Sequence, residues 1–186
     1  MMPTMLDKLL TAEEFARLPD DGVLEELVRG RIVKMPMPRA RHGQACSTIC
    51  YLLTHFSKSQ DLGHVLTNDT GIITERDPDT VRGADVAFYS YSRVPKGPLP
   101  DRKYLSVAPE VVFEVRSPED KWSMLNAKVA EYLEAGVLVV CVVEPLRGCV
   151  TVYTADEAPE KLTANDVLKL PNVLPGFSVP ISELFA

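Results

Sequence analysis

Two acidic residues stand inside runs that otherwise predict buried β-strands. Asp85 interrupts the apolar run at residues 84–88, and Glu114 lies in the apolar run at residues 111–115. An ionised carboxylate inside a sheet is costly unless it is paired or binds a cation. Two strand-borne carboxylates with a nearby base are sufficient to hold a divalent metal ion against a phosphodiester. The pattern therefore predicts a metal site with Asp85 and Glu114 as ligands.

A basic residue follows Glu114 at the spacing that places it on the same face of a strand. Side chains alternate between faces, so Arg116 shares the face of Glu114. Arg116 could orient water or hold a phosphate, but an arginine in a protein cannot act as a base because it does not lose its proton. Two plainer interpretations stay open: an ion pair between Glu114 and Arg116, and an Asp85 that caps a strand or pairs with Arg82.

The sequence before Asp85 predicts a short helix, a hairpin and a long helix. Thr11 and Glu14 have the spacing of a capping box, and the runs at residues 23–28 and 31–35 indicate two hairpin strands. Residues 40–58 show the apolar spacing of a helix with one buried face. His42 lies at the N-terminal end of that face, so it points to the core, as a histidine with satisfied hydrogen bonds, or to a cleft near the metal.

The sequence after Glu114 predicts a second helix that could return a cation to the strand ends. Ser117 and Pro118 have the form of a helix start, and the helix is expected to end at residues 135–136. Lys128 lies on the flank of its apolar face, where a lysine often only extends its amine to solvent. We expect further strands at residues 65–67, 71–75, 83–89, 137–143 and 150–153, a basic loop at residues 92–106, and a polar tail after residue 153.

Composition limits the class of protein. The 186 residues are 46% hydrophobic and 25% charged, which suits one α+β domain covering residues 1–186. The net charge of −6 argues against broad non-specific binding of nucleic acid. None of the four cysteines forms a C-x-x-C pair, so we expect reduced thiols in a cytoplasmic protein, the alternative being a structural zinc site. We expect no signal peptide and no membrane span.

Several motifs, in order, resemble one known family over about residues 9–185. The order of two acidic strands, a helix and a buried strand is that of the PD-(D/E)XK nuclease fold, and the motifs resemble its Uma2 family of restriction endonucleases. The matching motifs are Glu26-Leu27-Val28-Arg29-Gly30-Arg31-Ile32-Val33, His42, Asp85-Val86, Glu114-Val115-Arg116-Ser117-Pro118, Lys128 with Tyr132 and Ala135-Gly136-Val137, and Leu174-Pro175-Gly176-Phe177.

The resemblance implies a restriction-endonuclease-like mixed β-sheet flanked by helices, with an N-terminal β-hairpin and helix. It implies a homodimeric endonuclease that hydrolyses DNA with Mg²⁺ or Mn²⁺. Arg116 stands where the superfamily has its lysine, so the resemblance places that role on Lys128. It also suggests that Glu26 completes the metal shell, the alternative being an exposed hairpin acid. The competing function is a catalytically inactive nuclease-like domain that binds a protein or nucleic-acid partner, which the acidic net charge favours.

Overall fold

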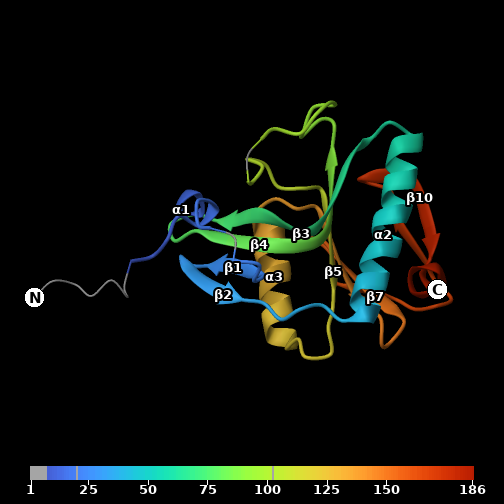
Figure 1. Ribbon diagram of the computed structural model, residues 1–186. Coiled ribbons are helices and arrows are strands. Elements are labelled where there is room, and N and C mark those ends of the chain that lie inside the picture. The colour runs from blue at the N-terminus through green and yellow to red at the C-terminus, as the bar shows by residue number, and fades with distance from the viewer. Residues whose placement is uncertain (1–7, 20, 102) are drawn as a thin grey trace, which may run out of the picture.

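The structure is a computed structural model that describes residues 8–19, 21–101 and 103–186. The strands of its main sheet are β1 (Glu25–Val28), β2 (Arg31–Lys34), β3 (Gly63–Glu75), β4 (Thr80–Ser90), β5 (Val111–Val115), β6 (Val139–Glu144), β7 (Cys149–Tyr153) and β8 (Glu160–Leu162). Within the described residues, seven of these eight strands are ordered β2-β1-β4-β5-β6-β7-β8, and the eighth, β3, pairs with β4 (Figure 1). Strands β5 and β6 are parallel, whereas β4 and β5 are antiparallel. The predicted mixed α+β sheet is therefore confirmed.

Two helices cover the two faces of this sheet. Helix α2 (Ala40–Ser59) buries Ala45, Ile49 and Leu53 in the core on one face, as the predicted apolar spacing requires. Helix α3 (Trp122–Glu134) packs on the other face through Leu125, Val129 and Tyr132. Because β5 and β6 are covered on both faces, their sequences are almost continuously apolar. None of the described helices is long and apolar enough to cross a membrane.

The N-terminal segment forms the expected helix and hairpin. Thr11 caps α1 (Ala12–Ala16), and its side chain and that of Glu14 form a reciprocal capping box. Strands β1 and β2 pair in antiparallel register and turn at Arg29 and Gly30, which have φ angles of 49° and 73°. The hairpin lies beside β4, through the pair Leu27 and Val81. It thereby brings the acidic motif of β1 towards the centre of the sheet.

The structure corrects the predicted start of α3. The helix begins at Trp122, with Lys121 as its N-cap residue, and not at Ser117 and Pro118. The reason is a local turn, in which the Asp120 carboxylate accepts a hydrogen bond from the Ser117 backbone N–H at 2.7 Å. The acidic side chain that suggests a helix start therefore closes a turn just before the helix.

The structure also corrects the predicted polar tail. Strands β9 (Val167–Leu170) and β10 (Leu174–Pro180) form an antiparallel pair, followed by the 3-10 helix η1 (Ile181–Phe185). Figure 1 shows β10 beside α2. The rings of Phe56 and Phe177 make an edge-to-face contact, with their centres 5.4 Å apart. The C-terminal segment is therefore part of the core that holds α2 in place.

Candidate active site

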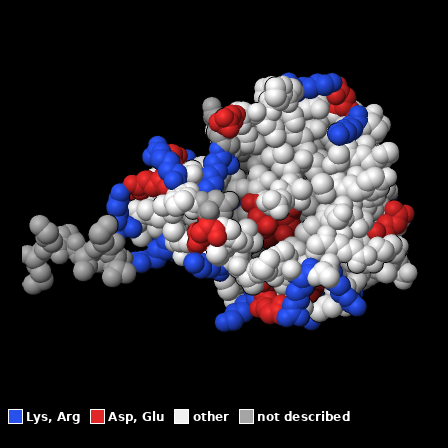
Figure 2. Space-filling model, in the orientation of Figure 1, with Lys and Arg blue, Asp and Glu red and all other residues white. Residues whose placement is uncertain are grey.

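Asp85 and Glu114 lie on neighbouring paired strands and face one cleft. Asp85 is on β4 and Glu114 on β5, just beyond the last paired residues of the two strands, Val86 and Phe113. Both line a cleft of about 410 Å³, here called the acidic cleft, which also contains Glu26, His42, Asp69 and Lys128. Figure 2 shows acidic side chains in the hollow at the centre of this face, surrounded by a mostly uncharged surface. The two strand carboxylates therefore share one cleft, as the predicted metal site requires.

Each of the two carboxylates is held by one short hydrogen bond. The backbone N–H of Val115 donates to Asp85 Oδ2 at 2.6 Å, and the Tyr132 hydroxyl donates to Glu114 Oε1 at 2.8 Å. Asp85 Oδ1 lies 3.2 Å from His42 Nε2, so His42 faces the cleft. The bonds fix the orientation of both acids, and they leave the second oxygen of each in weaker contacts.

Lys128 reaches into the acidic cleft from α3 and lies between two acids. Its Nζ is 2.7 Å from Glu26 Oε1 and 3.4 Å from Glu114 Oε2. Only 13% of its side chain is exposed, so its amine does not extend to solvent as a flanking lysine often does. Although burial lowers the pKa of Lys128, the charges of Glu114 and Glu26 raise it overall. Lys128 is therefore a fixed cation at neutral pH.

Glu26 is a buried residue of β1 whose two oxygens already have cationic partners. Its Oε1 contacts Lys128, and its Oε2 lies 2.9 Å from Arg82, which also pairs with Glu131 at 2.6 Å. The alternative of an exposed hairpin acid is thus wrong. Among the described residues, Arg82 pairs with these acids and not with Asp85. To bind a metal ion, Glu26 would have to give up these contacts. The geometry therefore favours a role for Glu26 in holding the Lys128 side chain in position.

Arg116 does not line the acidic cleft, contrary to its expected place beside Glu114. Its NH1 lies 3.4 Å from Glu144 Oε2, and its NH2 donates to the Asp120 carbonyl at 3.1 Å. Its guanidinium also stacks on Trp122, 4.8 Å from the ring centre. Among the described residues it makes no ion pair with Glu114. The buried Glu144 at the end of β6 pairs with the arginine instead, and Lys128 is the cation that contacts Glu114 in the cleft.

Asp69 is a cleft residue that the sequence did not indicate. Strand β3 is continuous where two strands were expected, but its register shifts between Thr67 and Thr70. The two bulged residues, Asn68 and Asp69, have φ angles of 67° and 54°, and the bulge directs Asp69 into the cleft. Burial raises the pKa of Asp69, and the charge of Asp85 adds to the effect. Finding this residue requires the bulge, which has no reliable sequence signal.

Tyr132 is a second site residue, which the sequence analysis placed in the family motif with Lys128 but did not assign to the site. It is fully buried in the α3 core, yet its hydroxyl holds Glu114. Burial raises the pKa of Tyr132 well above its usual value, so the hydroxyl keeps its proton and donates a hydrogen bond to the carboxylate. Its position four residues after Lys128 was an available signal, because residues at that spacing share a helix face.

The acidic cleft makes stability depend on pH through Glu114. Burial raises the pKa of Glu114 to about 7, Lys128 opposes this, and Asp85 adds to it. The folded state therefore binds more protons than the unfolded state between about pH 4.5 and pH 7, and the free energy of unfolding falls as pH rises through that window. We expect Glu114→Gln to be more stable than the parent by about 1–3 kcal/mol near pH 8, with the gain much reduced near pH 5.

Urea unfolding at the two pH values measures this difference. Glu134→Gln is the matched control, because Glu134 is an exposed acid on the same helix. An equal effect of Glu114→Gln at both pH values would mean that Glu114 is already ionised in the folded protein below neutral pH.

Comparisons with known proteins agree with this architecture. The family model of Uma2, described as "Putative restriction endonuclease", matches residues 12–182. The chain is also similar to a crystal structure described as a putative nuclease belonging to DUF820 from Anabaena variabilis, with a TM-score of 0.83 and 20% sequence identity. That likeness covers 95% of this chain and 97% of the other. At this identity it shows a shared fold. No curated protein matches the sequence.

Proposed function

Because this chain belongs to the Uma2 family, described as "Putative restriction endonuclease", we propose that it hydrolyses DNA phosphodiester bonds with a bound divalent metal ion. The observation that carries the proposal is the joint position of Asp85, Glu114 and Lys128 in one cleft. Hydrolysis of a phosphodiester needs ligands for a metal ion and a cation near the phosphate that gains negative charge. The acidic cleft offers both.

The donor set suits Mg²⁺ or Mn²⁺. Carboxylate oxygens are the ligands that these hard cations prefer, and Asp85 and Glu114 present them from fixed positions. The negative charge of Asp85 disfavours ionisation of Glu114, and a cation between the two would relieve this repulsion. When bound, such an ion would polarise the phosphate and lower the pKa of a water molecule. We assign Glu26 to positioning Lys128, since its oxygens are already paired.

The remaining chemistry is assigned to the side chains of the cleft. Hydrolysis forms a bond from a water oxygen to phosphorus and breaks the bond from phosphorus to a sugar oxygen. The water gives up one proton to solvent and the sugar oxygen takes up one, so the proton count is unchanged. Lys128 keeps its proton, so it stabilises negative charge on the phosphate oxygens and does not accept the water proton. His42 is in contact with Asp85 and holds that carboxylate in orientation.

Incubation of supercoiled plasmid DNA with the protein tests the proposal. We expect nicked or linear product with Mg²⁺ or Mn²⁺, and none when a chelator is present. The same ions at 100 times their Kd should stabilise the protein by about 2.7 kcal/mol, or roughly 5–10 °C in Tm. Intact plasmid under all metal conditions would refute the nuclease proposal.

The second candidate is a catalytically inactive nuclease-like domain that binds a partner. The net charge of −6 and the mostly uncharged surface around the cleft favour it, because DNA-binding surfaces are usually basic. This candidate is supported if the metal ions neither stabilise the protein nor allow cleavage. A homodimer stays a prediction of the family resemblance, and a cytoplasmic location stays a prediction of the cysteine pattern.

A further inference from the structure

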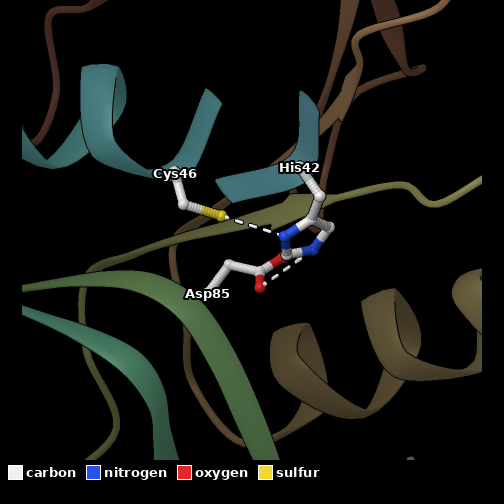
Figure 3. Close-up of side chains that lie close together, drawn as sticks. All are labelled: His42, Cys46 and Asp85. Carbon is white, nitrogen blue, oxygen red and sulfur yellow. Dashed lines mark hydrogen bonds and ion pairs between the residues drawn. The ribbon is translucent and has the colours of Figure 1, made fainter. Parts of the chain in front are cut away.

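Three different metal-binding side chains meet at the first turns of α2. His42 and Cys46 are one helical turn apart, and His42 Nδ1 lies 3.4 Å from Cys46 Sγ. The other ring nitrogen, Nε2, lies 3.2 Å from Asp85 Oδ1 (Figure 3). One ligand atom from each residue can be chosen so that all three lie within 4.8 Å of one another. Cys46 has no part in the proposed hydrolysis.

The separation of the histidine and cysteine ligand atoms matches that of a zinc site. A tetrahedral zinc ion bound to sulfur at about 2.3 Å and to nitrogen at about 2.0–2.1 Å holds these ligand atoms about 3.5 Å apart. The distance from His42 Nδ1 to Cys46 Sγ is 3.4 Å, so the helix already holds this edge of the site. Asp85, fixed by the Val115 N–H, supplies an oxygen on the third side. Because the thiol faces Nδ1 and the Asp85 oxygen faces Nε2, the ion would bind one ring nitrogen, and the side chain on the other side of the ring would shift towards it.

We propose that His42, Cys46 and Asp85 bind a soft divalent cation of the Zn²⁺ class. A thiolate and an imidazole favour zinc over magnesium, whereas the carboxylates of the acidic cleft favour magnesium or manganese. The three residues line a groove of about 760 Å³ along α2, which leaves access for the ion and a water molecule as fourth ligand. Binding breaks the S–H bond of Cys46, forms a sulfur–zinc bond and releases the proton to the buffer.

The site would regulate the nuclease because Asp85 belongs to both places. The groove and the acidic cleft share His42, Asp69 and Asp85. When the Asp85 carboxylate binds zinc together with Cys46, it can no longer bind magnesium or manganese together with Glu114. Zinc then inhibits cleavage. This consequence rests on the proposed function, whereas binding of the ion does not.

Titration of the full chain with Co²⁺, a coloured substitute for zinc, tests the site directly. We expect a sulfur-to-cobalt charge-transfer band in the near ultraviolet that zinc abolishes by competition. Cys46→Ser should lose the band, and calorimetry should show at least about tenfold weaker zinc binding, the lower end of the cost of losing even an outer-shell partner. Cys50→Ser is the matched control, because Cys50 lies in the same groove one turn further along α2 and should keep the band.

The outcomes separate this proposal from the nuclease proposal. A cobalt band that depends on Cys46 supports the site even if plasmid DNA is never cut. If DNA is cut, zinc should inhibit the parent and Cys50→Ser but not Cys46→Ser. Absence of the band in the parent, or a band that persists in Cys46→Ser, would overturn the proposed site.

Discussion

Replacement of Lys128 by alanine is expected to slow metal-dependent DNA cleavage by about 10²–10³-fold, the usual cost of removing one group that stabilises charge in a transition state. Lys128 is a fixed cation between Glu26 and Glu114. Without it the acidic cleft becomes more negative, so Mn²⁺ binding should be retained or strengthened. The expected signature is therefore a large loss of turnover without a loss of metal binding, measured by plasmid nicking and by calorimetry.

A second variant guards against loss of folding. Lys128→Met keeps most of the buried stem while it removes the charge, so it should fold and show the same loss of turnover. Lys169→Ala, at an exposed position of β9, is the control for general effects of removing a lysine. Parental turnover in Lys128→Met would show that Lys128 serves only to neutralise Glu26.

The elements that the sequence predicted well are those set by local pattern. The apolar spacing of α2, the β-branched run of β5 and the capping box of α1 each depend on residues within a few positions of one another. Such signals hold because the same burial and capping would stabilise these segments in many folds. The predicted start of α3 was wrong for a related reason. The Asp120 carboxylate accepts a hydrogen bond from the nearby Ser117 N–H, and turns and helix starts use the same residue types.

The elements that the sequence analysis missed depend on contacts between residues that are far apart in the chain. The β9–β10 pair contains Pro175 and Gly176, which usually indicate a loop, and it is held as a hairpin by packing of Phe177 on Phe56 of α2. Strand β3 looks broken at Asn68 and Asp69, but pairing with β4 continues on both sides of the bulge. Tertiary packing here overrides the local preference.

The candidate site divides in the same way. Asp85 and Glu114 could be found because a carboxylate in an apolar strand is unusual in itself. The partners of Glu26 could not, since Arg82 and Lys128 are far from it in sequence and meet it only when the hairpin lies against β4. The predicted place of Arg116 beside Glu114 was wrong because Arg116 pairs with Glu144 on the neighbouring strand instead.

Asp85→Asn is expected to reduce Mn²⁺ affinity by at least about 10–100-fold and to reduce cleavage with it. Asparagine has nearly the same size, and its side-chain oxygen can still accept the hydrogen bond from the Val115 N–H. The substitution therefore removes the charge and leaves the geometry. It also removes a negative neighbour of Glu114 and Asp69, so the metal-free variant should be no less stable than the parent.

Calorimetry with Mn²⁺ and the plasmid assay together distinguish a ligand from a merely nearby acid. Asp156→Asn, at an exposed position away from the sheet faces, should bind and cleave as the parent does. If Asp85→Asn lost cleavage but bound Mn²⁺ as tightly as the parent, Asp85 would act on the substrate or on His42, and the metal site would have to be sought elsewhere. The expected pair of results is that Asp85→Asn loses Mn²⁺ binding while Lys128→Met retains it. Each change removes one kind of charge from the same cleft. Together they would assign metal coordination to Asp85 on β4 and charge stabilisation to Lys128 on α3.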